Sequence, residues 1–248
     1  MSLPCALSFQ SICQGHEIDA SCGPDGSATT DAQKAQNTAK NDFCASGTPA
    51  SLSFSHFDTL QASAAAAHIP FGSAFHLPPD RSQLARLLPL PGVGTVGEGP
   101  VVRLAAFVID AHYSNVSRGE SVNCNNPGPE FNDIHIVLAE QAPTAQAPFD
   151  ECSSVTAEIS PHFRPVAWTP ETLNNLARTK QFRLTGQLFF NAAHRPCEGG
   201  TVSSPARRSL FEIHPVYAVE VCKSASSCKV EDDAAWIALN DWLHGGGG

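Results

Sequence analysis

The feature that most constrains the fold is an alternation of apolar and polar residues that begins near residue 101 and recurs along the chain. Side chains of a β-strand point to opposite faces in turn, so this period of two predicts strands with one buried face. Five segments show it: 101–114, 132–140, 153–161, 181–191 and 209–222. A helix is predicted between the third and fourth segments, where Thr169 is a candidate N-cap followed by Pro170 and Glu171.

The resulting order, β-β-β-α-β-β, is typical of a small Greek-key barrel with the OB-fold layout. In that layout the strands neighbour one another in the order one-two-three-five-four and back to one. Gly186, inside the fourth strand, suits the bend or bulge that closing a barrel requires. We therefore expect a mainly β protein with flanking helices, built on a five-stranded OB-like barrel. An α+β sandwich is the alternative fold.

The 248 residues are enough for a barrel of roughly 130 residues and a substantial appendage. We expect residues 1–99 to form a Cys-rich, partly helical N-terminal region, 100–223 the barrel, and 224–248 a tail in which at least one tryptophan packs on the barrel. The N-terminal region carries a capping box at Thr30 and Gln33 and a helix-like run, "FDTLQASAAAA". A short helix capped by Asp80 and carrying Leu84, Leu87 and Leu88 is predicted next, before the linker "PLPGVGTVGEGP".

Nine cysteines without metal-type CxxC pairs favour disulfides and an oxidising compartment. We therefore expect a secreted or periplasmic protein whose leader has been replaced by Met1. Two bridges are predicted, Cys222 with Cys228 and Cys124 with Cys152. The polar helix after Thr30 is expected to be held by Cys22 and Cys44, and Cys5 is the candidate for the odd thiol.

The formal net charge of −9 argues against nucleic-acid binding, because such proteins need a basic surface to displace counterions from phosphates. A nuclease with a local basic patch stays compatible with this charge. No window approaches the roughly 18 apolar residues of a membrane helix. The expected partner is thus a small ligand or another protein, and the oligomeric state is left open.

Ionisable residues recur on the strands that the barrel layout makes neighbours. Asp133 and His135 share one face of the second strand, Glu158 is on the third, and Glu212 and His214 share a face of the fifth. Carboxylates and imidazoles bind Zn²⁺ and similar divalent ions, and they also serve as general acids and bases. The candidate metal ligands are Asp133, His135 and His214; the candidate catalytic residues are Glu158, Glu212 and Arg195, the last to stabilise a developing anion.

Further ionisable residues could join this group. His162 lies just past the third strand, His194 precedes Arg195, and Asp110 and His112 lie on the first strand. The competing interpretation is structural. Cross-strand pairs of histidine and acid stabilise sheets by roughly 0.2–1 kcal/mol without any function.

Four segments carry a resemblance to a known group of proteins: "NDIHIVL", "SSVTAEISPHFRP", "RLTGQLFFNAAHRPC" and "FEIHPV". From about residue 100 to 222, half of the chain, the sequence resembles an uncharacterised group of secreted bacterial proteins. The resemblance implies no activity and supports only the limits of the barrel. The barrel layout is also similar to that of the staphylococcal-nuclease superfamily, whose local motifs do not align here, so this similarity is one of fold alone.

The function we expect is that of a secreted, metal-assisted hydrolase that acts on phosphodiesters, with Zn²⁺ or another divalent metal as the candidate cofactor. Two other classes stay open. One is a non-catalytic extracellular module that binds a ligand or a protein, and the other is a disulfide-stapled structural surface protein. Convergence of the histidines of the second and fifth strands on a shared carboxylate would favour the first class.

Overall fold

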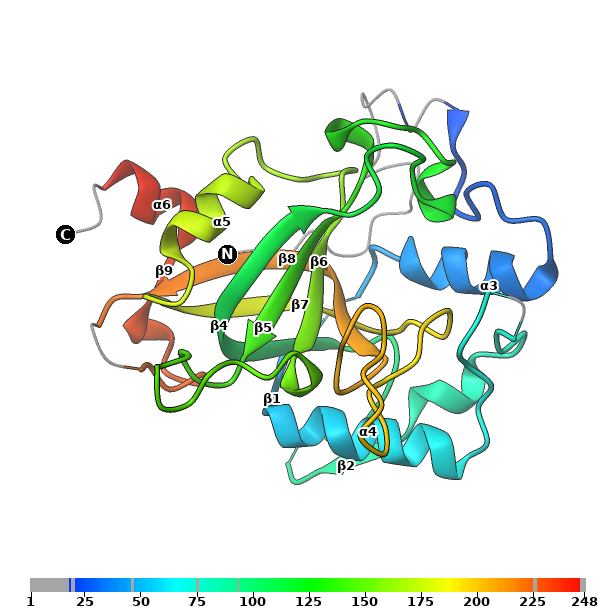
Figure 1. Ribbon diagram of the computed structural model, residues 1–248, viewed down its shortest axis with the longest axis horizontal. Coiled ribbons are helices and arrows are strands. Elements are labelled where there is room, and N and C mark those ends of the chain that lie inside the picture. Colours follow the sequence, from blue (N-terminus) through cyan, green and yellow to red (C-terminus); the bar gives the residue numbers. More distant parts are fainter. Residues whose placement is uncertain are drawn as a thin grey trace.

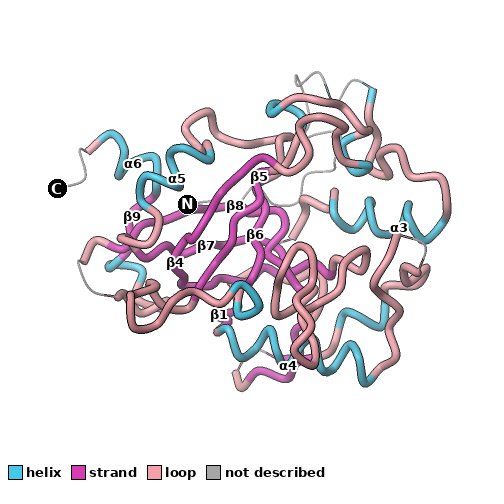
Figure 2. Tube along the Cα trace, viewed as in Figure 1, coloured by secondary structure: helices cyan, strands magenta, loops and turns pink. Residues whose placement is uncertain are grey.

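The computed structural model describes residues 18, 21–45, 47–74, 76–92, 94–224 and 227–245. It is mainly β, with a closed five-stranded barrel and a few helices around it (Figures 1 and 2). The barrel strands are β4 (Val101–Tyr113), β5 (Ile134–Ala139), β6 (Val155–Ile159), β7 (Gln181–Phe190) and β8 (Phe211–Cys222). They begin and end within about two residues of the alternating segments, so the five predicted strands are confirmed.

The barrel strands follow the neighbour order β4-β5-β6-β8-β7, and pairing of β4 with β7 closes the ring. All these pairs are antiparallel except β6 with β8, which is parallel. The order is the one predicted from the element sequence. Because the sheet closes on itself, the alternative of an α+β sandwich is wrong.

The interior of the barrel is apolar because alternate residues of each strand point inward. Ile134, Ile136 and Leu138 of β5 are fully buried. Gly186 lies at a bulge in the pairing of β7 with β8. A Cβ at this position would come within 2.4 Å of the Pro215 carbonyl oxygen and 2.5 Å of Ile213 Cγ2, so only glycine allows this close approach.

The helix α5 (Pro170–Leu176) lies between β6 and β7 in the chain, as predicted. Thr169 accepts a hydrogen bond from the Thr172 N–H, and Leu173 is buried. The side chain of Asn174 bonds both the N–H and the carbonyl of Ala111, which fixes α5 against β4. These two bonds give hydrogen-bond partners to a main-chain N–H and a main-chain carbonyl of β4.

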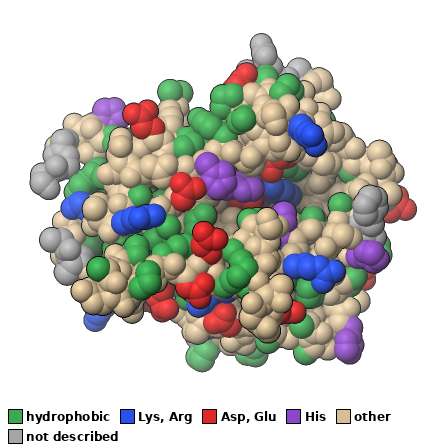
Figure 3. All heavy atoms as spheres, viewed as in Figure 1, with side chains coloured by type: hydrophobic (Ala, Val, Ile, Leu, Met, Phe, Trp, Pro, Cys, Tyr) green, Lys and Arg blue, Asp and Glu red, His purple; other side chains and the backbone are tan. Residues whose placement is uncertain are grey.

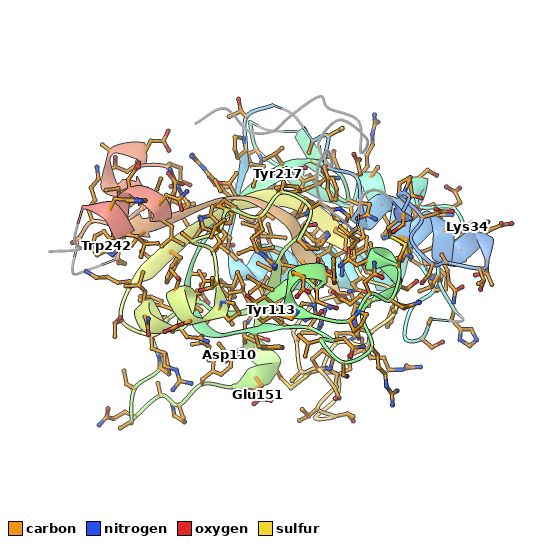
Figure 4. The ribbon with its side chains drawn as sticks, turned by 90° about the horizontal axis from the view of Figure 1, so that it is seen from above. Lys34, Asp110, Tyr113, Glu151, Tyr217 and Trp242 are labelled. Atoms are coloured by element: carbon orange, nitrogen blue, oxygen red, sulfur yellow. A yellow bond between two sulfur atoms is a disulfide. The ribbon has the colours of Figure 1, made fainter. Side chains whose placement is uncertain are left out.

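The C-terminal residues add β9 (Trp236–Ala238), which pairs with β8, and α6 (Leu239–His244). Trp236 is buried and Trp242 packs partly against the core, which confirms the prediction that a tryptophan of the tail contacts the barrel. In Figure 4 Trp242 lies at the opposite end of the molecule from Lys34.

The N-terminal part contains α3 (Asp31–Lys40), β1 (Ala50–Leu52), which is parallel to β4, and α4 (Phe54–Ala66). The capping box of Thr30 and Gln33 is present, and α4 covers the run "FDTLQASAAAA". Two details differ from the prediction. The helix after Asp80 is a single 3₁₀ turn, Ser82–Ala85, and the predicted linker forms a hairpin of β2 (Leu88–Leu90) and β3 (Gly94–Val96).

Four other 3₁₀ turns lie in the connections, Ser121–Asn123, Pro129–Phe131, Glu151–Ser153 and Asp233–Ala235. The first two belong to the long loop between β4 and β5. In Figure 1, α3 lies to the right of the barrel strands and α4 below them. The buried core runs without interruption from the barrel to Phe57, Leu60 and Leu84.

Within the described residues, three disulfides join Cys22 to Cys124, Cys152 to Cys197 and Cys222 to Cys228. The last is the short loop that was predicted. The predicted bridge between Cys124 and Cys152 is wrong, because each cysteine pairs elsewhere. Cys22 does hold the region around α3, but its partner is in the loop between β4 and β5.

Cys5 lies outside the described residues. The three bridges fit an extracellular or periplasmic location. Among the helices of the described ranges, none is long and apolar enough to cross a bilayer.

Candidate functional site: a buried carboxylate and imidazole cluster

Three neighbouring strands bring ionisable side chains together on the outer face of the barrel. His135 of β5 is paired directly with Glu158 of β6, and Ala157 of β6 is paired with Ile213 of β8. Since neighbours of inward-pointing residues point outward, His135, Glu158 and His214 share this outer face. The convergence of the second, third and fifth strands that the sequence suggests is therefore present.

Glu158 is at the centre of the group, with one imidazole near each carboxylate oxygen. Its Oε1 lies 3.0 Å from Nε2 of His135, and its Oε2 lies 3.1 Å from Nδ1 of His214. The side chains of Glu158 and His214 are 0% and 1% exposed, whereas that of His135 is 19% exposed. His135 is thus on the solvent side of a pair that is otherwise closed off.

A lysine from the N-terminal region completes the cluster. The Nζ atom of Lys40, at the end of α3, lies 2.7 Å from Glu158 Oε2, 3.0 Å from Asp133 Oδ2 and 3.7 Å from Glu120 Oε1. Glu120 also approaches His135, at 3.6 Å. We refer to these six residues as the Glu158 cluster: Lys40, Glu120, Asp133, His135, Glu158 and His214.

Sequence reasoning missed Lys40 and Glu120. Glu120 is in the loop between β4 and β5, where no periodicity indicates which side chains turn inward. For Lys40 a signal was present: α3 has no apolar stripe, yet it is a helix of a folded chain, so a polar face has to be the one that docks. The buried residues of α3 are indeed Gln36, Asn37 and Lys40.

Many polar atoms of the cluster are buried without a hydrogen bond. Within the described part of the chain, this holds for Asp133 Oδ2, both carboxylate oxygens of Glu158, His135 Nε2 and both ring nitrogens of His214. Several of these atoms lie 2.7–3.1 Å from an ionisable neighbour, so ion pairs compensate them in part. Buried polar groups in proteins are nearly always hydrogen-bonded, so such a concentration points to a ligand-binding centre.

The charges of the cluster perturb one another strongly. Burial alone would lower the pKa of His135, but the charge of Glu158 raises it to about 10. Burial works against the ionised form of Glu158, yet the charges of His135 and Lys40 hold the pKa of its carboxyl well below the usual range. In Asp133, burial and the charge of Glu120 raise the pKa. The nearby cations therefore stabilise the ionised form of Glu158, whereas the negative charge of Asp133 is only partly balanced.

Glu212, predicted to be catalytic, lies next to the cluster and has its own partners. Arg207 Nη1 is 3.0 Å from its Oε2, and the side-chain amide of Asn191 donates to its Oε1. Glu212 and Arg207 are both fully buried. Burial, followed by the charge of Glu158, raises the pKa of Glu212 to about 7.

The carboxylates of this region outnumber its cations. Four carboxylates, from Glu120, Asp133, Glu158 and Glu212, face three cations, from Lys40, protonated His135 and Arg207. The raised pKa values of Glu212 and Asp133 reflect burial and this imbalance of charge, which either a proton or a further cation can relieve.

His162 lies behind the cluster. Its Nε2 is 3.2 Å from Asn123 Oδ1, and the Asn123 amide donates to Asp133 Oδ1. His162 is therefore linked to the cluster through Asn123.

Asp110 and His112 lie at the solvent side of the cluster. Oδ2 of Asp110 is 2.6 Å from Nδ1 of His112, and the ring centre of His112 is 5.8 Å from that of His135. Both side chains are half exposed. This pair extends the line of ionisable groups from the buried centre to the surface of β4.

His194 and Arg195 follow β7. His194 is partly buried, and burial, with the nearby charge of Arg207, lowers its pKa to about 4. Arg195 is exposed, and its guanidinium packs against the backbone of Gly72. The role of Arg195 toward a substrate anion remains a prediction.

Two sets of three side chains have the chemistry of a metal site. Asp133, Glu158 and His214 form a buried set, and Glu120, Asp133 and His135 form a second set nearer to solvent; within each set the candidate ligand atoms lie within 4.8 Å of one another. Ligand atoms that share one ion at about 2.1 Å are at most about 4.2 Å apart. Small side-chain shifts would therefore bring either set to a binding geometry.

One face of the molecule carries ionisable side chains around a recess (Figure 3). Figure 3 shows histidine, acidic and basic side chains gathered in a hollow near the middle of one face of the molecule.

Comparison with protein-family models, with curated proteins and with solved structures finds no significant match for this chain.

Proposed function

We propose that the chain is an extracellular, metal-assisted hydrolase whose ion is held by Asp133, Glu158 and His214. The observation that carries this proposal is the convergence of buried carboxylate and imidazole atoms from three adjacent strands, with the ligand atoms of Asp133, Glu158 and His214 within 4.8 Å of one another. A bound Zn²⁺ or similar ion would polarise an ester oxygen and lower the pKa of a water molecule. Two carboxylates and one imidazole are a known ligand type for such ions.

The other residues of the cluster have distinct roles in this proposal. His135 is partly open to solvent, is positioned by Glu158 and is protonated because its pKa is raised to about 10, so it is the group that can donate a proton to a bound substrate. Glu120, with Asp133 and His135, offers a second ligand set on the solvent side. Glu212 is paired with Arg207 and supports the cluster from the interior.

The substrate class and the fold family belong to the same proposal. The neighbour order β4-β5-β6-β8-β7 with α5 between β6 and β7 supports an OB-like barrel, and the fold analogy with the staphylococcal-nuclease superfamily favours phosphodiesters. The resemblance to secreted bacterial proteins and the three disulfides support an extracellular or periplasmic location.

The test begins with elemental analysis of protein purified without chelators. Hydrolysis of bis(p-nitrophenyl) phosphate and p-nitrophenyl acetate is then measured after addition of Zn²⁺, Mn²⁺ or EDTA. The variant His135→Ala should lower the metal-dependent rate by about 10²-fold or more, the usual contribution of a general acid or base. His76→Ala, at an exposed histidine of the N-terminal part, is the matched control and should keep the wild-type rate.

One observation favours a second function. Lys40 already supplies a positive charge to Asp133 and Glu158, as expected if the cluster only fixes α3 to the barrel in a structural or binding module. Equal rates for wild type and His135→Ala at saturating Zn²⁺ and Mn²⁺ would favour that module and contradict the hydrolase.

A further inference from the structure

Lys40 lies within the buried set of candidate metal ligands. Its Nζ lies 2.7 Å from Glu158 Oε2 and 3.0 Å from Asp133 Oδ2, and these two residues, with His214, form the buried set. His214 Nδ1 lies 3.1 Å from the same oxygen of Glu158 that Lys40 contacts. The ammonium group is thus a cation placed among two carboxylates and an imidazole, where a metal ion would lie.

The helix that carries Lys40 is docked through polar contacts. The Asn37 amide donates to the Ser121 hydroxyl and the Asp25 carbonyl, and the Asn41 amide donates to the carbonyls of Pro24 and Val122. Gln36 Oε1 accepts from the Ala192 N–H. Water can replace each of these bonds when α3 moves away from the barrel.

A disulfide keeps α3 near the site even when those contacts open. Cys22, nine residues before the first residue of α3, is bonded to Cys124 in the loop that carries Glu120. The tether limits how far the helix can travel, and the hydrogen bonds of Asn37 and Asn41 hold it closed together with that of Gln36 and the ion pairs of Lys40. After α3 the chain continues into the buried Phe43 and into β1, which pairs with β4, so α3 is a cover attached at both ends.

We propose that Lys40 is a built-in cation that fills the metal position of Asp133, Glu158 and His214, and that α3 is an inhibitory cover of this site. The inference rests on the proposed metal centre and adds its regulation. With α3 in place the ammonium and a divalent ion exclude each other, since both need the same carboxylate oxygens. When α3 withdraws, the carboxylates are left without their counter-charge and bind an ion from solution.

The test compares metal binding by the full chain in the wild type and in Lys40→Met, which keeps the length of the side chain and removes its charge. Lys34→Met is the matched control, because Lys34 is an exposed lysine on the same helix (Figure 4). Zn²⁺ and Mn²⁺ are titrated calorimetrically, and thermal unfolding is followed with each ion and with EDTA. Lys40→Met should bind at least tenfold more tightly than the wild type, and its lowered melting temperature in EDTA should rise when metal is added.

A second pair of variants tests the same inference without removing the lysine. Asn37→Ala combined with Asn41→Ala loosens α3 and should also increase metal affinity, whereas Lys40→Arg keeps the positive charge and should not. The proposal is overturned if folded Lys40→Met binds no more metal than Lys34→Met, or if Lys40→Met fails to fold in the presence of metal as well as in its absence.

These results separate the inference from the proposed hydrolase. Increased metal binding by Lys40→Met without any ester hydrolysis would support the cover and reject the hydrolase. Metal-dependent hydrolysis at the same rate in wild type and Lys40→Met would support the hydrolase and reject the cover.

Discussion

Nζ of Lys40 lies 2.7 Å from Oε2 of Glu158, although the two residues come from different parts of the chain and both side chains are almost entirely buried. Glu158 also contacts His135 and His214. One carboxylate thus holds together a helix of the N-terminal part and three strands of the barrel. Its replacement should affect stability as well as any chemistry of the cluster.

Glu158→Gln is expected to lower the free energy of unfolding by about 3–5 kcal/mol, because removal of one partner leaves Lys40 buried without its nearest counter-charge. Urea denaturation of the wild type and the variant measures this loss. Glu140→Gln, at an exposed acid just after β5, is the control and should change the free energy by less than about 0.5 kcal/mol. A loss below about 1 kcal/mol for Glu158→Gln would show that the contacts with Lys40 and the histidines contribute little to folding.

Gly186→Ala should destabilise the barrel, since the new methyl group would overlap the Pro215 carbonyl and the Ile213 side chain. Forcing an extra carbon into a packed core costs about 1–3 kcal/mol, and here one of the neighbours is backbone, which yields less easily. The measurement is the midpoint of urea unfolding. An unchanged midpoint would mean that the bulge between β7 and β8 relaxes without cost.

The disulfides are expected to differ in their contribution according to the loop that each closes. Cys22 and Cys124 are 102 residues apart, and Cys222 and Cys228 only 6. By the loop-entropy relation, loss of the long bridge lowers the free energy of unfolding by about 4–5 kcal/mol and loss of the short one by about 2 kcal/mol. Paired Cys→Ser variants measured in urea test this order; an equal or reversed effect would show that native-state contacts outweigh loop closure.

His194 should make the protein less stable in acid. Its pKa is lowered to about 4 by burial and by Arg207, while that of an unfolded histidine is near 6.5. Between these values the unfolded chain binds the proton more readily, so the free energy of unfolding decreases as the pH falls from about 6.5 towards 4.

His194→Gln removes this titration. Between pH 7.5 and pH 4.5 the free energy of unfolding of the variant should therefore fall by about 2 kcal/mol less than that of the wild type. The acids of the Glu158 cluster titrate in both proteins and cancel in the comparison. Parallel pH profiles for the two proteins would show that His194 is protonated in the folded state with little penalty.

Most of the barrel was predictable, because alternating side chains are a local property of each strand. β5 shows this clearly: Ile134, Ile136 and Leu138 fix its inward face, so His135 has to point outward. The three-residue strands β1, β2 and β3 are too short to show a period, and they exist only through their partners. The same limit applies to the disulfides, because spacing along the chain does not determine that Cys22 reaches Cys124.

The candidate site, like the fold, was predictable only in part. Asp133, His135, Glu158 and His214 were predicted because the strand order makes their positions neighbours. Lys40 enters through docking of a helix from another region and Glu120 through a loop, so neither contact follows from local pattern. The sequence therefore predicted the anionic and imidazole side of the site and missed the cation that compensates it.

The central claim, that Asp133, Glu158 and His214 form a cation site filled by Lys40, is tested most directly by anomalous diffraction at the zinc edge. Crystals of wild type and Lys40→Met would be grown with Zn²⁺. We predict a strong peak between these three side chains in Lys40→Met and a weak peak or none at that position in the wild type. Intact contacts of α3 and no peak at this position in Lys40→Met would contradict the claim.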